Sequence, residues 1–71
     1  MRMIAVNIKR ENSYRADRYG YLDTEEALSF AMPYGIRQGY EGRVSSLEDA
    51  LLSHNPVICG DKIIWLSEGE F

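Results

Sequence analysis

Alternating apolar and polar residues near the N-terminus predict a β-strand with one buried face. Ile4, Val6 and Ile8 are separated by small or polar residues, which is the two-residue period of a strand. The sequence "ENS" that follows, at 11–13, is typical of a turn. Residues 14–22 are rich in aromatic side chains and predict a second, partly exposed strand. We expect the two strands to form a hairpin.

The sequence "DTEEALSFAM" predicts a helix that begins at about Thr24. Asp23 is a suitable N-cap, and Glu26 lies three residues later, which is the pattern of a capping box. At helical spacing, one face of this helix carries Ala27, Leu28, Ala31 and Met32. Pro33 is expected to limit the helix, with Gly35 as a left-handed exit. The helix is therefore predicted to be short and to dock on the sheet.

The sequence "SSLEDALL" predicts a second helix. Two capping pairs are available, Ser45 with Glu48 or Ser46 with Asp49. The apolar stripe of this helix consists of Leu47, Ala50 and Leu51. We expect the helix to end near 54–56, where the sequence is His-Asn-Pro.

The sequence "PVICGDKIIWL" predicts a second hairpin, because two β-rich runs flank a Gly-Asp connection. This turn pairs Cys59 with Lys62, Ile58 with Ile63 and Val57 with Ile64. One face then carries Val57, Cys59, Ile64 and Leu66, and the other carries Ile58, Ile63 and Trp65. Because both faces are apolar, the hairpin is either central in the sheet or meets another molecule, and a homodimer through 57–66 is one such case. Residues 67–71 are expected to form a frayed acidic tail.

The order of these elements is β-β-α-α-β-β, which predicts an α+β fold. We expect a small two-layer domain over 1–71, with an antiparallel sheet of two hairpins and two short helices packed on one face. A domain of 71 residues buries only about 60% of the surface that its unfolded chain exposes. Its stability is therefore expected to be marginal or shared with a partner.

Charge and cysteine content narrow the class of protein. The net charge is −3, which argues against a nucleic-acid-binding protein because these usually carry a basic surface. Cys59 is the single cysteine, so no intrachain disulfide can form and a reducing compartment is expected. The sequence contains no apolar run of ~20 residues. We therefore expect a cytoplasmic protein that does not enter a membrane.

The residues that usually carry catalysis or bind metals are scarce. His54 and Cys59 are the only soft metal ligands, whereas structural zinc needs about four. Two carboxylate pairs, at 25–26 and 48–49, lie in predicted first helical turns, where the helix dipole and capping favour acidic residues. We expect no metal site.

The glycines of "YGIRQGYEGR" resemble a phosphate-binding loop only superficially. Their spacing, at positions 35, 39 and 42, fits neither the dinucleotide fingerprint nor the P-loop. A loop that uses positive φ angles explains them better. We therefore expect a protein that is not an enzyme and binds no cofactor.

All five tyrosines lie between Tyr14 and Tyr40, with four arginines among them. Tyrosine and arginine dominate binding hot spots, and a small domain has little interior for so many rings. We therefore predict a partner-binding surface made of Arg15, Arg18, Tyr19, Tyr21, Tyr34, Arg37, Tyr40 and Arg43. If the second strand lies at an edge of the sheet, Tyr19 and Tyr21 share a side with Arg15 and Asp17. The glycine-containing loop is expected to bring the remaining members nearby.

Two kinds of partner suit such a surface. A larger protein or protein complex would use these residues as amphipathic anchors, and single-stranded nucleic acid would stack its bases on the tyrosines. Acidic residues interleaved with them would repel a phosphate backbone, which favours the protein. The predicted layout is similar in architecture to small phage-encoded proteins that block host enzymes or defence complexes. We therefore expect a stoichiometric inhibitor or regulator.

Overall fold

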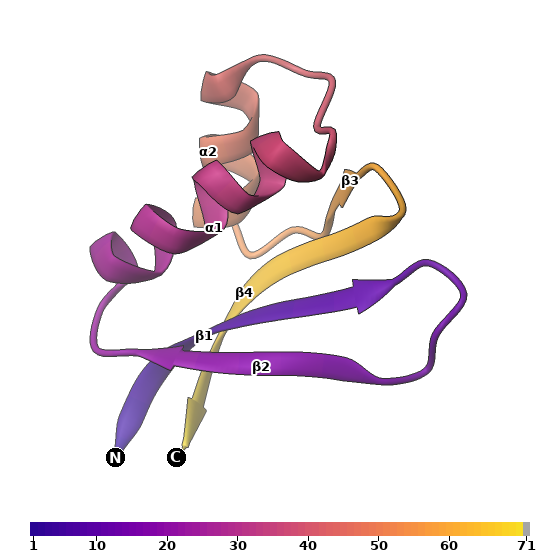
Figure 1. Ribbon diagram of the computed structural model, residues 1–71. Helices are drawn as coiled ribbons and strands as arrows, with labels where there is room; N and C mark the ends of the chain where they lie inside the picture. The colour runs from indigo at the N-terminus through magenta and orange to yellow at the C-terminus, as the bar shows by residue number, and fades with distance from the viewer. Residues whose placement is uncertain (71) are drawn as a thin grey trace.

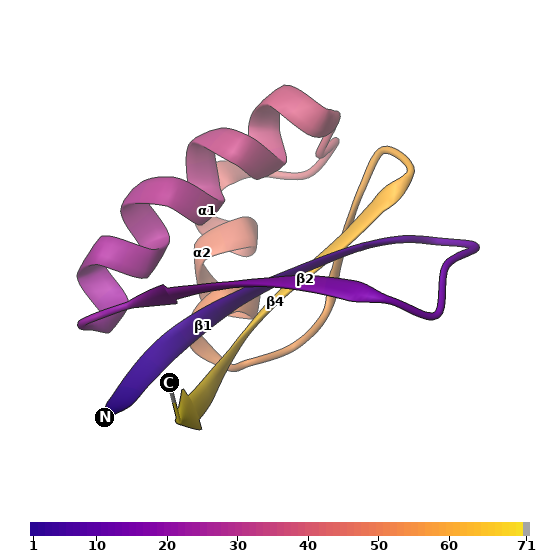
Figure 2. The ribbon, with the colours of Figure 1, turned by 60° about the horizontal axis from the view of Figure 1, so that its bottom comes forward.

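The computed structural model describes residues 1–70 and has the order β-β-α-α-β-β. Its elements are β1 (Arg2–Arg10), β2 (Ala16–Tyr21), α1 (Thr24–Gln38), α2 (Val44–Leu52), β3 (Val57–Cys59) and β4 (Lys62–Glu70). The strands form one antiparallel sheet in the order β2-β1-β4-β3. Both helices cover the same face of the sheet (Figures 1 and 2). The predicted α+β fold is confirmed, and we call the two faces of the sheet the helix side and the open side.

The core lies between the sheet and the helices, because alternate residues of the central strands point toward the helix side. Val6 of β1 is paired with Leu66 of β4 and Ile8 with Ile64, and all four side chains are buried. The helices contribute the buried residues Ala27, Ala31, Leu47 and Leu51. Burial of these apolar side chains stabilises the two layers by about 25 cal/mol per Å².

The second hairpin has the predicted register, with Cys59 opposite Lys62 and Val57 opposite Ile64. The strand β4 lies inside the sheet and β3 lies at its edge. Ile58, on the face away from the core, is 61% exposed.

The prediction of a frayed tail is wrong for residues 67–70, which belong to β4 and pair with the first residues of β1. Phe71 lies outside the described residues. Two ion pairs hold the strand ends together: Arg2 Nη2 lies 2.7 Å from Glu68 Oε2, and the N-terminal amine lies 3.3 Å from Glu70 Oε2. The acidic side chains are thus placed beside the positive charges of the N-terminus, which the local sequence does not reveal.

The predicted start of α1 is confirmed. The backbone N–H of Glu26 donates to Asp23 Oδ1 at 2.9 Å. Glu26 Oε2 in turn accepts a hydrogen bond from the backbone N–H of Leu22 at 3.1 Å. These reciprocal bonds satisfy amide groups that would otherwise lack a partner at the first helical turn.

The predicted end of α1 is wrong, because the helix passes through Pro33 and ends at Gln38. Pro33 is exposed, so the carbonyl that its missing N–H leaves without a partner can be hydrated. Gly35 is buried inside the helix, and Gly39, with φ 109°, is the left-handed cap. A Cβ on Gly35 would lie 3.2 Å from Cys59 Sγ. The close packing of Gly35 against β3 therefore stabilises the helical turns of α1 that follow Pro33.

The predicted caps of α2 are also wrong. The helix begins at Val44, and its N-cap, Arg43, makes no side-chain cap bond. Arg43 is extended, and its carbonyl accepts hydrogen bonds from Ser46 and Leu47 at 3.0 and 3.1 Å. The helical bonds therefore begin before the serines, and Ser45 and Ser46 lie in the first turn.

We predict that Gly60→Ala destabilises the fold by about 2 kcal/mol or more. Gly60 has φ 64°, a conformation that costs energy for other residues, and its Cβ would collide with the backbone carbonyl oxygen of Gln38. Urea unfolding followed by circular dichroism measures the change. Gly20→Ala is the matched control, since Gly20 is an exposed strand residue without a positive φ. Equal stability of the two variants would contradict this account of the turn.

Candidate functional site

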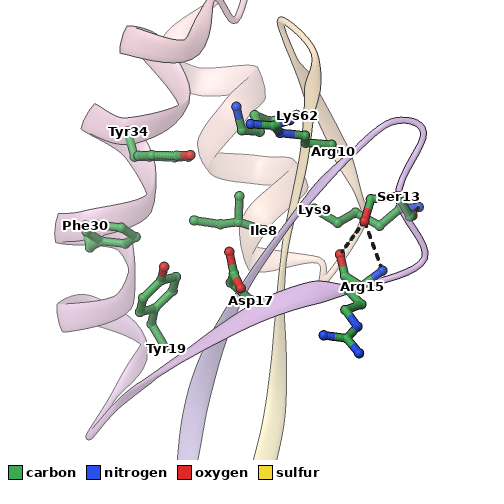
Figure 3. Close-up of a pocket in the computed structure, with 10 residues that line it drawn as sticks. All are labelled: Ile8, Lys9, Arg10, Ser13, Arg15, Asp17, Tyr19, Phe30, Tyr34 and Lys62. Atoms are coloured by element: carbon green, nitrogen blue, oxygen red, sulfur yellow. Dashed lines mark hydrogen bonds between the residues drawn. The ribbon is translucent and has the colours of Figure 1, made fainter.

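An open groove of about 320 Å³ lies on the helix side of the sheet, between α1 and the β1–β2 hairpin. The hairpin reaches beyond the helix layer (Figures 1 and 2), so the helices leave its outer half uncovered. The groove is lined by Ile8, Lys9, Arg10, Ser13, Arg15, Asp17, Tyr19, Phe30, Tyr34 and Lys62 (Figure 3). Both sheet and helix contribute to this site.

One wall of the groove is aromatic and is organised around Phe30. Its ring centroid lies 5.5 Å from that of Tyr34, and 5.8 Å from those of Tyr19 and Tyr21. Phe30 and Tyr34 are four residues apart on α1, so they share a helix face. The β1–β2 register places Tyr19 opposite Val6 and Tyr21 two residues further on, so both tyrosines point to the helix side.

Desolvation by burial raises the pKa of Tyr21 above its ordinary value, and Tyr19 and Glu26 add smaller contributions in the same direction. This ring therefore keeps its hydroxyl proton at neutral pH. The cluster combines the apolar surface of its four rings with the hydroxyl groups of its three tyrosines, which can form hydrogen bonds.

The other part of the groove is basic. Four of its lining residues are cationic, Lys9, Arg10, Arg15 and Lys62, against a single acidic one, Asp17. Arg10 and Lys62 are directly opposite each other in the β1–β4 pairing, and like charges in such a pair are destabilising; Lys62 Nζ also lies 3.3 Å from Asp61 Oδ1. An anion bound between them would relieve this repulsion.

Hydrogen bonds at the hairpin tip fix the neighbouring backbone. Lys9 Nζ donates to the Ser13 carbonyl at 2.9 Å. The backbone N–H of Arg15 donates to Ser13 Oγ at 3.1 Å (Figure 3). The Arg15 side chain extends beside β2 (Figure 3). The tip therefore holds the start of β2, and with it Arg15, at the mouth of the groove.

The structure brings together part of the predicted binding surface. Arg15, Tyr19 and Tyr34 line the groove, and Tyr21 adjoins them through its stacked contact with Phe30. Tyr19 and Asp17 lie on the helix side of an edge strand, as the strand period predicts.

The other predicted members lie elsewhere. Arg18 alternates with Asp17 and Tyr19 and is paired with Asn7, so it belongs to the open side. Tyr40 lines a separate hollow with Ile58 and Gly60. The positively charged residues flanking this loop are Arg37, in the last turn of α1, and Arg43, the N-cap of α2. Because α1 extends past Pro33, the loop after it lies against the β3–β4 turn rather than over β2.

Four residues that supply the charge and the central ring of the groove were not predicted from the sequence: Lys9, Arg10, Phe30 and Lys62. Arg10 and Lys62 meet only because β1 pairs with β4, which no local signal predicts. Phe30 is four residues before Tyr34, and this spacing would have indicated a shared face had the helix been extended through Pro33.

The rest of residues 1–70 contains no cluster of metal-ligating side chains and no exposed cysteine. No group of three or more His, Cys, Asp or Glu side chains could hold a metal ion within this range. Cys59 is buried, and desolvation raises the pKa of its thiol. In the same part of the chain, neither helix is long and apolar enough to cross a membrane.

Comparisons with protein-family models, with curated proteins and with solved structures found no match to this chain. The geometry of the groove is therefore the main guide to function.

We predict that Cys59 is chemically inert in the native protein. At pH 8 an aromatic disulfide reagent should react with Cys59 at least ~100-fold more slowly in the native protein than in the denatured protein. The reaction needs a thiol that is both exposed to solvent and deprotonated, and burial disfavours exposure and deprotonation alike. Absorbance of the released thiolate measures both rates, and the denatured protein is the internal control. Equal rates would place the thiol at the surface and contradict the packing of Gly35 against it.

Proposed function

We propose that this protein is a non-enzymatic binding module that recognises an extended, acidic segment of a larger protein and acts by stoichiometric occupancy, as an inhibitor or regulator. The observation that carries the proposal is the meeting of an aromatic wall and four cations in one open groove, in a protein of net charge −3. The positive charge is concentrated in the groove and is opposite in sign to the net charge of the chain.

The charges of the groove select an acidic partner. Arginine binds carboxylates through paired, charge-assisted hydrogen bonds, and both Arg10 and Arg15 line the groove. A carboxylate near Arg10 would also offset its repulsion from Lys62. A bound carboxylate would therefore form a new ion pair and reduce the repulsion between Arg10 and Lys62.

The rings support a protein partner because they are already ordered. Tyr19 is 45% exposed, yet its ring contacts Phe30, which also stacks on Tyr34. A partner that packs on such rings loses little further side-chain entropy, and this is how aromatic residues serve as anchors in interfaces.

Single-stranded nucleic acid is the second candidate, favoured by the same combination of rings and cations. Base stacking needs open ring faces, however, and the stacked neighbours Tyr21 and Tyr34 occupy those of Phe30. Asp17 lies within the groove and would repel phosphates and carboxylates alike, so it does not separate the two candidates. The occupied ring faces favour the acidic peptide.

The test is fluorescence anisotropy with a labelled eight-residue peptide in which glutamate alternates with valine, at low ionic strength. We predict that Arg15→Glu combined with Lys62→Glu weakens binding about tenfold or more, because two attractive surface charge pairs, each worth about 0.2–1 kcal/mol, become repulsive. Arg37→Glu combined with Arg43→Glu is the matched control. It changes the net charge equally but lies outside the residues that line the groove.

Each other outcome counts against the proposal. Equal weakening by both double variants would mean that overall charge, not the groove, attracts the peptide. Binding of the lysine-valine counterpart as tightly as the glutamate peptide would exclude an acidic partner. Tighter binding of an eight-nucleotide oligothymidylate, with affinity that falls steeply with salt, would establish the nucleic-acid alternative.

A further inference from the structure

The strand β2 offers an open edge for another strand. It is the first strand of the sheet and has β1 as its single strand neighbour. Its six residues contain no proline, and six consecutive residue pairs join it to β1 without a bulge. Prolines and bulges are two of the features that usually prevent an edge strand from pairing with another chain, and β2 has neither. The opposite edge, β3, has three residues and is a much shorter template.

Both sides of this edge suit an acidic strand. On the helix side, Arg15 and Tyr19 line the groove next to β2. On the open side, Arg18 lies between Ala16 and Gly20; the methyl group of Ala16 and the absence of a side chain at Gly20 leave room for the side chains of an added strand. Because side chains of a strand alternate between faces, a strand beside β2 would meet a cation on each face of the sheet.

We propose that the acidic segment binds as a fifth strand, antiparallel or parallel to β2, with its backbone hydrogen-bonded to the outer edge of β2. This inference rests on the proposed function and gives the binding mode of the part of the partner that meets Arg15; Arg10 and Lys62 lie on β1 and β4, on the far side of β2 from the added strand, and meet a neighbouring part of the partner. It accounts for Arg18, which belongs to the predicted surface but does not line the groove. Backbone bonds supply affinity in this mode, and alternate side chains supply specificity.

Charge argues against a second copy of this chain as the added strand. Pairing of β2 with itself would bring two arginines, Arg15 and Arg18, and one aspartate, Asp17, from each copy to one junction, which leaves an excess of like positive charge that is destabilising. An acidic segment places opposite charges there instead.

The first experiment uses two N-methylated forms of the glutamate-valine peptide. One form carries methyl groups on the glutamate amides and the other on the valine amides, so each blocks the hydrogen bonds of one edge of the peptide. A strand added to β2 uses one edge only. We expect one form to bind at least tenfold more weakly and the other within about threefold of the unmodified peptide.

The second experiment follows the protein, by amide hydrogen exchange with NMR detection. Addition of the unmodified peptide should slow exchange at alternate residues of β2 about tenfold or more, and leave β3 unchanged. For a second eight-residue peptide that repeats Glu-Glu-Val-Val, and so carries carboxylates on both faces of an added strand, Arg18→Glu should weaken binding, while Arg43→Glu should not.

The possible failures are distinct. If the peptide binds but neither methylated form weakens, or both weaken equally, the added strand is wrong while the acidic partner stands. If the glutamate peptide does not bind at all, the proposed function fails and the binding mode with it. If light scattering shows a dimer whose formation protects β2 without peptide, the strand pairs with a second copy and the proposal is overturned.

Discussion

The pairing of β1 with β4 is the constraint on which the rest of the structure depends. Each hairpin alone is a two-stranded ribbon, which is marginally stable in water. The nine residue pairs between β1 and β4 join the ribbons into one sheet and complete the apolar surface that the helices cover. The same pairing places Arg10 opposite Lys62 and so creates the positive end of the groove. Fold and candidate site thus share one cause.

Small residues decide where the helix layer sits. Ala27, Ala31 and Gly35 are buried along one face of α1, and they let the helix approach the sheet closely. Gly35 packs near Cys59 of β3, whereas Phe30 contacts the tyrosines of β2. The helix therefore crosses the sheet and leaves the outer half of the first hairpin uncovered (Figure 2). The groove is a consequence of this diagonal packing.

Local chemistry in the sequence predicted much of the fold. The capping pair of Asp23 and Glu26 and the Gly60-Asp61 turn act over a few residues, and both occur as expected. The predictions that were wrong concern features that depend on contacts distant in sequence. Packing against β3 lets α1 continue past Pro33, and pairing with β1 makes residues 67–70 part of β4. The residues of the candidate site also fall into two groups, those that local sequence predicts and those that depend on strand order. Tyr19 followed from strand alternation, but Lys62 required knowledge of which strands are neighbours.

The position of β4 also has a consequence for how the chain folds during synthesis. The last strand lies in the middle of the sheet, and its final residues pair with the first residues of β1. Contacts between opposite ends of a chain close the longest loop that the chain can form, and such topologies fold slowly. While residues 62–70 remain within the ribosome, β1 lacks a neighbour on one side. The sheet is therefore completed only once residues 62–70 have emerged, when β4 takes its place between β1 and β3.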